Sequence, residues 1–241
     1  MSEVKTGLDA IKSAEGERES FLRYIGKEDS IIVRMLAETE VAEVLTHGVY
    51  QVFNTVGHTE ENYYDKASAV IFDEANKLKE ELEKMQKGTE EYKKAEENWK
   101  TVIKRAYALQ AEPQYLFAFV ELPTGNLIAV PSGKKQAPAT FNKIKKYQSQ
   151  KDTFAFEITK ASGGFDVSPI LEPLTPEQQA IFEKTKELKV PVEMFEKAYY
   201  KPSPEQQLEH LKKFGFNISK IVSLPKTEGA PLDISDEDLP F

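Results

Sequence analysis

Hydrophobic and polar residues follow two different periods along this chain, and each period predicts one kind of element. Short runs rich in β-branched and aromatic residues, bounded by glycine, proline or polar residues, are typical of strands. The expected strands are residues 30–36, 47–53, 114–122, 127–131, 153–160 and 165–170. Pro123-Thr124-Gly125-Asn126 and Ala161-Ser162-Gly163-Gly164 separate neighbouring runs, so each is expected to form the turn of a hairpin.

Between the second and third expected strands the period changes to that of a helix. From Asp65 onward, hydrophobic residues recur at three- and four-residue steps on an otherwise charged sequence. Gly88 interrupts this spacing, and Thr89 can cap a second helix. Residues 65–110 are therefore expected to form a helical hairpin whose charged face is solvated.

The C-terminal third is expected to be helical and segmented. Thr175-Pro176-Glu177 and Ser203-Pro204-Glu205 each combine a capping residue, a proline at the first helical position and an early carboxylate. Gly215 is expected to end the second of these helices. Further short helices are expected near residues 141–147 and 191–200.

Together these elements predict an α+β fold built on an OB-fold-like small β-barrel, partly open, with a helical-hairpin insertion and C-terminal helices. The expected parts are an N-terminal arm (1–20), an OB-fold core (21–172) with the insertion at 65–110, a helical segment (173–224) and a disordered acidic tail (225–241).

Composition excludes several classes of protein and of site. No uncharged apolar run reaches the roughly 18 residues of a membrane span, and the polar N-terminus does not predict a signal peptide. The absence of cysteine fits a reducing compartment, so a cytoplasmic location is expected. His47, His58 and His210 are far apart in sequence without an HxH or HxxxH pair, so neither a metal site nor another cofactor is expected. No catalytic motif occurs, and an enzyme is not expected.

Charge is distributed unevenly along the chain, whose net charge is -8. Residues 99–160 carry ten basic and four acidic side chains, whereas the last fourteen residues carry five acidic side chains and no basic one. A basic middle favours binding of nucleic-acid phosphates. The acidic tail is expected to compete with phosphates for the basic surface when salt is low.

Binding of unpaired strands requires cations for phosphates and exposed rings for base stacking. The candidate DNA-binding residues are Arg34, Tyr50, Phe53, Lys104, Arg105, Tyr115, Phe117, Lys134, Lys135, Lys143, Lys145, Lys146, Tyr147, Lys160 and Phe165. Two alternatives stay open. The strand at 114–122 is hydrophobic on both faces, which also fits a strand buried on both sides, and the lysines at 143–146 also fit a solvated helix face.

The last six residues, Asp236-Glu237-Asp238-Leu239-Pro240-Phe241, resemble the C-terminal tip of bacterial single-stranded-DNA-binding proteins, which usually have Ile at the position of Leu239. The layout of the body is similar to that of phage-encoded helix-destabilising proteins of the T-even type. The segments that carry this similarity are "FLRYIGKEDSIIVRML", "YLFAFVELPTGNLIAV" and "FAFEITKASGGFDVSPI".

The resemblance implies sequence-independent binding of single-stranded DNA in phage DNA replication, recombination and repair. It also implies that the six tip residues recruit replication and recombination proteins, and that the N-terminal arm contacts a neighbouring copy on DNA. The T-even type carries a zinc ribbon in the barrel insertion, but this chain has no cysteine there, so zinc is not carried over. An alternative from another class is a non-enzymatic protein-interaction adaptor or a virion-associated protein.

Overall fold

A computed structural model describes residues 21–36, 40–162 and 164–222. The chain forms two compact units. The first comprises Met1–Val44 and Gln114–Ala198, and the second comprises Leu45–Pro113 and Tyr199–Phe241. The expected N-terminal arm and the acidic tail lie outside the described residues.

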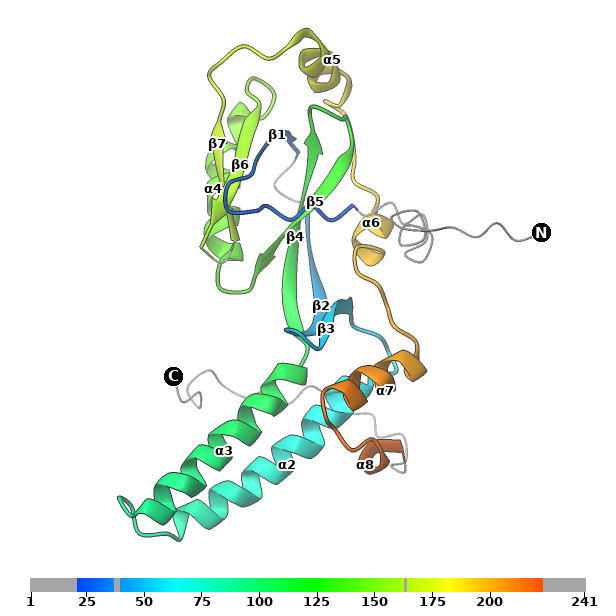
Figure 1. Cartoon of the computed structure of the whole chain (residues 1–241). Helices are drawn as coiled ribbons and strands as arrows, with labels where there is room; N and C mark the ends of the chain where they lie inside the picture. The colour runs from blue at the N-terminus through cyan, green and yellow to red at the C-terminus, as the bar shows by residue number, and fades with distance from the viewer. Residues whose placement is uncertain (1–20, 37–39, 163, 223–241) are drawn as a thin grey trace, which may run out of the picture. The chain divides into compact units, whose positions relative to one another are not determined.

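The described strands form an antiparallel sheet in the order β3-β2-β4-β1-β6-β7, with β5 paired to β4 (Figure 1). Their bounds are β1 Ser30–Met35, β2 Val41–Val49, β3 Phe53–Gly57, β4 Glu112–Glu121, β5 Leu127–Gly133, β6 Phe156–Ala161 and β7 Gly164–Pro169. The expected α+β class is thereby confirmed. The sheet is open rather than closed into a barrel.

β4 pairs with β1 and β5 and is hydrophobic on both faces. Phe117 and Phe119 contribute to a cluster with Val33, Phe156 and residues of the other strands, and all four of these side chains are buried. On the opposite face of β4, Leu116, Ala118 and Val120 are buried as well, and so is Leu122 directly after the strand. The interpretation of a strand buried on both sides is therefore confirmed.

Three helices of the first unit, α4, α5 and α6, each bury apolar side chains. α4 (Ala137–Tyr147) places Ala137 and Ile144 in the same cluster, and the 3-10 turn η1 (Gln148–Gln150) follows it. α5 (Pro176–Lys184) starts with a capping box at Thr175, as its sequence predicts, and buries Phe182. α6 (Val192–Glu196) buries Met194 and Phe195.

The second unit contains the helical hairpin that the sequence predicts. α2 (Tyr63–Glu83) and α3 (Glu90–Leu109) lie side by side, capped by the side chains of Asn62 and Thr89 (Figure 1). Gly88 joins them with a φ of 90°, and an added Cβ at this residue would meet no atom within 4 Å. α7 (Pro204–Lys213) starts with a capping box at Ser203, Gly215 follows it with a φ of 79°, and α8 is Ser219–Val222.

One expected strand is wrong. Residues 47–53 are not continuous, because β2 and β3 form a hairpin with a turn at Tyr50–Val52. Gln51 has a φ of 62°, a backbone conformation that residues other than glycine seldom adopt. This conformation helps to reverse the chain. A smaller difference is that the strand expected at 153–160 begins only at Phe156.

None of the helices that the structure describes combines the length and the hydropathy needed to cross a membrane.

Candidate functional site

Lysines gather around α4 of the first unit. From residue 127 to residue 151 the sequence contains six lysines and no acidic residue. α4 buries Ala137, Thr140 and Ile144, so its lysines point away from the core. The exposed lysines in and beside this helix are called the α4 surface; they are Lys134, Lys135, Lys143, Lys145, Lys146 and Lys160.

Beside the α4 surface, the start of β7 lies close to the segment between β5 and α4. Gly164 begins β7, and a Cβ added there would lie only 3.0 Å from Ser132 Oγ and 3.1 Å from Gln136 Cβ. The start of β7 therefore packs directly against Ser132 of β5 and Gln136 before α4. Lys160 of β6 pairs with Phe165 of β7, so it lies on the strand next to this contact.

Most of these cations have no carboxylate partner. Lys143 forms an ion pair with Asp166 of β7. Within the described part of the chain, no ion pair occurs at Lys134, Lys135, Lys145 or Lys146. The ammonium of Lys146 lies 5.2 Å from the centroid of the Tyr147 ring. The α4 surface thus presents at least four cations to an external anion.

Arg34 was expected to contact DNA, but the structure contradicts this. The side chain is only 1% exposed. Its Nη2 pairs with Asp152, its Nη1 donates to the carbonyl of Phe182 at 3.1 Å, and its guanidinium stacks on the Phe182 ring at 4.6 Å. Lys151 and Arg34 hold the pKa of Asp152 below its usual value of 3.8, and the hydrogen bond from Lys151 contributes most. Arg34 is a structural cation.

Two expected stacking rings are also buried. Phe117 and Phe165 are 3% and 4% exposed, and their rings meet edge to face at 5.6 Å. Tyr115 and Tyr147 are half-buried and pack against the same core. A hydrogen bond to Glu43 raises the pKa of Tyr115. Tyr147 therefore adjoins the α4 surface, whereas Phe117 and Phe165 cannot reach a base without unfolding.

Four further candidates belong to the second unit. Tyr50 lies at the β2–β3 turn and is 89% exposed. Phe53 is half-buried because its ring stacks on Tyr64 and on His210. Lys104 and Arg105 are exposed on α3, where the Arg105 guanidinium lies 5.2 Å from the Phe214 ring. These four residues form no part of the α4 surface, which is built from the first unit alone.

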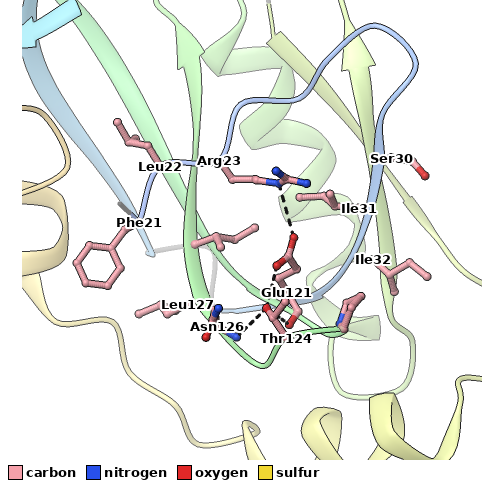
Figure 2. A pocket seen from close by; sticks show the side chains of 12 residues that line it. Phe21, Leu22, Arg23, Ser30, Ile31, Ile32, Glu121, Thr124, Asn126 and Leu127 are labelled. Carbon is pink, nitrogen blue, oxygen red and sulfur yellow. Dashed lines mark hydrogen bonds and ion pairs between the residues drawn. The ribbon is translucent and has the colours of Figure 1, made fainter. Parts of the chain in front are cut away.

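An open groove of about 900 Å³ lies elsewhere in the first unit, between residues 21–23, β1 and the β4–β5 turn (Figure 2). Arg23 is the basic residue that lines this groove, and its Nε lies 3.6 Å from Glu121 Oε1. The hydroxyl of Thr124 donates to the same carboxylate at 2.8 Å. Because Glu121 balances Arg23, the groove has no excess positive charge for phosphates.

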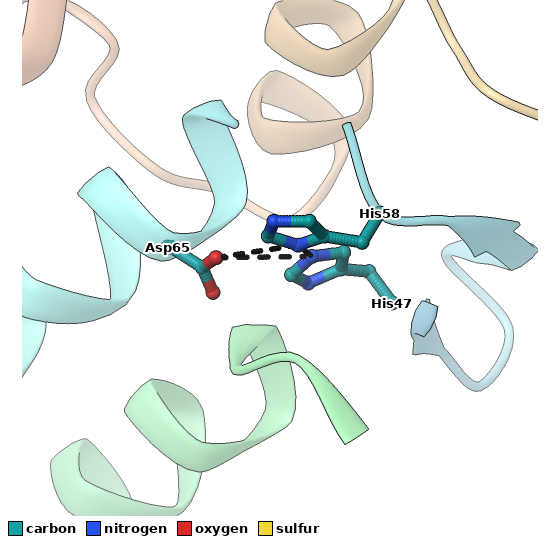
Figure 3. A group of neighbouring side chains, drawn as sticks. All are labelled: His47, His58 and Asp65. Carbon is teal, nitrogen blue, oxygen red and sulfur yellow. Dashed lines mark hydrogen bonds and ion pairs between the residues drawn. The ribbon is translucent and has the colours of Figure 1, made fainter. Parts of the chain in front are cut away.

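A cluster of titratable side chains, which we call the histidine corner, lies in the second unit and comprises His47, His58 and Asp65 (Figure 3). His47 is on β2, His58 directly follows β3, and Asp65 is in the first turn of α2. His47 Nε2 and His58 Nδ1 are 3.0 Å apart. The nearer oxygen of Asp65 is 3.6 Å from His58 Nδ1 and 4.0 Å from His47 Nε2.

Burial sets the protonation of His47, which is 1% exposed. It lowers the pKa of His47 below 6.5, and the opposing charge of Asp65 reduces but does not cancel that shift. His47 is therefore neutral at neutral pH. The expectation that the histidines are too far apart for a joint site is wrong for His47 and His58. The signal that would have revealed the pair is the β2–β3 hairpin, which reverses the chain between them.

The expected partner-binding residues 236–241 lie outside the described residues. Comparison of the chain with protein-family models, with curated proteins and with solved structures gives no match.

Proposed function

We propose that this protein binds single-stranded DNA without sequence preference, with the α4 surface holding the phosphates. The observation that carries the proposal is a run of six lysines without one acidic residue at 127–151. Four of these lysines are exposed and have no ion pair within the described residues. Surface cations on an ordinary solvated helix are usually interleaved with carboxylates, as they are on α3.

The proposed preference for single strands depends on rings beside the cations. Tyr147 and Lys146 are in contact on α4, a combination that can engage a base and its phosphate. Burial of Phe117 and Phe165 removes two expected stacking partners, so phosphate contacts should supply most of the affinity. Binding should accordingly weaken steeply with salt.

The finer assignment of the fold belongs to the same proposal. Antiparallel strands with a helix between β5 and β6 support an OB-fold-like arrangement, the design often used for oligonucleotides. We propose that the protein acts in DNA replication, recombination and repair, and that residues 236–241 recruit partner proteins. The resemblance of the tip to that of bacterial single-stranded-DNA-binding proteins supports this role.

A charge-matched pair of variants tests the α4 surface. The first replaces Lys134, Lys135, Lys145 and Lys146 by Gln, and the control replaces Lys77, Lys79, Lys84 and Lys94 of the helical hairpin by Gln. Each variant removes four positive charges from exposed positions. Titration with a fluorescent oligo-dT across a salt series should show a loss of about 10- to 100-fold for the first variant and a salt slope smaller by up to about 3.

The control variant should keep the wild-type affinity and slope. Equal losses in both variants would mean that only net charge matters, which would contradict a defined α4 interface. Failure of the wild-type chain to bind oligo-dT at low salt would reject the function itself. Competition with duplex of the same length measures the preference for single strands.

A further inference from the structure

The histidine corner carries an inference that does not depend on DNA binding. Its three side chains come from separate places in the sequence, and the β2–β3 hairpin and the start of α2 bring them to one point (Figure 3). We propose that His47, His58 and Asp65 bind one divalent transition-metal ion, with Zn²⁺ as the preferred ion. The argument rests on lone pairs, distances, charge and access.

The hydrogen bonds of His47 fix which ring nitrogen faces the corner with a lone pair. Its Nδ1 lies 2.9 Å from the carbonyl oxygen of Leu109, and a carbonyl only accepts hydrogen bonds. Nδ1 therefore carries the proton, and Nε2 presents a lone pair to the corner. A histidine that binds a metal through one ring nitrogen usually donates the N–H of the other to a carbonyl, a carboxylate or water.

Asn62 can stabilise a lone pair of His58 that faces the same point. The Asn62 side-chain oxygen accepts from the backbone nitrogen of Asp65 at 2.9 Å, which orients the amide. Its Nδ2 consequently faces the two rings, at 2.8 Å from His47 Nε2 and 3.1 Å from His58 Nδ1. An amide nitrogen has two hydrogens and can donate one to each ring. In the tautomer of His58 that is protonated at Nε2, two lone pairs converge beside this amide; in the other tautomer, His58 Nδ1 donates to His47 Nε2 at 3.0 Å.

The distances are close to those of a zinc site. Two ligands at about 2.0–2.1 Å from a tetrahedral zinc ion lie about 3.3 Å apart. The two ring nitrogens are 3.0 Å apart, and the Asp65 oxygen is 3.6 Å from the nearer of them. The same oxygen is 4.0 Å from His47 Nε2, so ion binding requires Asp65 to move closer by several tenths of an ångström. It also requires the Asn62 amide nitrogen to withdraw from the two ring nitrogens. The side chains of His58 and Asp65 are partly exposed and able to adjust, at 32% and 40%.

Ligand type and access favour Zn²⁺ over calcium or magnesium. Two imidazoles and one carboxylate suit Zn²⁺, Co²⁺ or Cu²⁺, whereas Ca²⁺ and Mg²⁺ require oxygen ligands. The Asp65 carboxylate supplies negative charge to balance the cation. Exposure of His58 and Asp65 leaves a path for the ion and room for a water molecule as a fourth ligand. The bound ion would join the β2–β3 hairpin to the first turn of α2.

The alternative is a metal-free network in which Asn62 satisfies both rings. The two explanations differ in stoichiometric metal binding, which the full-length chain without a polyhistidine tag can test. After dialysis against chelator, the protein would be titrated with Zn²⁺ and, in parallel, with Co²⁺ while its visible absorption is followed. His58→Gln and Asp65→Asn alter the partly exposed ligands and leave buried His47 in place, so both variants are expected to fold.

Matched controls are Asp73→Asn on the exposed side of α2 and His210→Gln, with folding of each variant followed by the fluorescence of Trp99. We expect one Zn²⁺ per wild-type chain, a raised thermal midpoint with Zn²⁺ and binding weakened at least about 10-fold in both site variants. Wild-type affinity is expected in both controls. Absence of saturable binding, or equal binding in site variants and wild type, would overturn the proposal in favour of the metal-free network.

Discussion

The two compact units place their polar chemistry in different ways. The main hydrophobic cluster of the first unit is apolar, Arg34 is its buried and paired cation, and its exposed lysines gather around α4. The second unit buries polar groups, among them His47, Asn62 and Gln207, and carries an alternating charge pattern on its long helices. Surface chemistry can be read from the charges in a sequence, whereas buried chemistry depends on which segments meet. The difference predicts how each unit responds to substitution.

The largest effect is expected from the apolar core of the first unit. Phe156 is fully buried in the main cluster, and Phe156→Ala should lower the free energy of unfolding by about 3–5 kcal/mol because a cavity remains. Chemical denaturation followed by circular dichroism measures the change. Phe154→Ala is the matched control, since Phe154 is only half-buried, and it should cost clearly less. Similar losses would show that this core is not the main source of stability.

A smaller loss is expected from the buried polar network of the second unit. Gln207 is 1% exposed; its side-chain oxygen accepts from the Tyr63 backbone nitrogen, and its side-chain nitrogen contacts Thr59 Oγ1 and two carbonyl oxygens. Gln207→Leu keeps the volume but leaves these groups unpaired, so the free energy of unfolding should fall by about 2–3 kcal/mol. Exposed Glu209→Ala is the control on the same helix. If Gln207→Leu left the free energy of unfolding unchanged or raised it, packing rather than hydrogen bonding would dominate this site.

The smallest effect is a difference between the units in acid. Burial holds the pKa of His210 below 6.5, assisted by Lys213 and opposed by Glu209, so the unfolded chain takes up this proton first. The second unit should therefore lose stability as pH falls below 6.5. In the first unit the pKa of Asp152 lies below 3.8, so its contribution persists until pH falls below that value.

Trp99, the single tryptophan, reports on the second unit, and hydrogen exchange of β4 and β6 amides reports on the first. His210→Gln should reduce the pH dependence of the Trp99 signal between neutral pH and pH 5. Simultaneous loss of both signals well above pH 3.8 would contradict the separate response of the two units.

Features encoded within a few neighbouring residues could be predicted from the sequence. The caps at Thr89, Thr175 and Ser203 act on backbone groups three positions away, and all three are found where they were expected. The hydrophobic residues of the helical hairpin recur every three or four positions, a spacing that strands do not have. The turn at 123–126 contains Gly125, whose φ of 73° suits glycine.

Features that depend on distant partners could not be predicted. Arg34 is neutralised by Asp152, 118 residues away, so an apparent surface cation is a buried one. The turn at Gln51, which the sequence did not predict, also determines whether His47 and His58 meet. Because a continuous strand at 47–53 carries the chain forward, it separates His47 from His58, whereas the hairpin pairs His47 with Val56 and returns the chain to the same edge.

The tip of the helical hairpin offers a practical handle for spectroscopy. Gly88 is surrounded by open space, its neighbour Lys87 is exposed, and the chain contains no cysteine. Lys87→Cys would therefore introduce a unique thiol at a position that neither core uses. A maleimide dye attached there would allow single-molecule measurements on the second unit without competing labels.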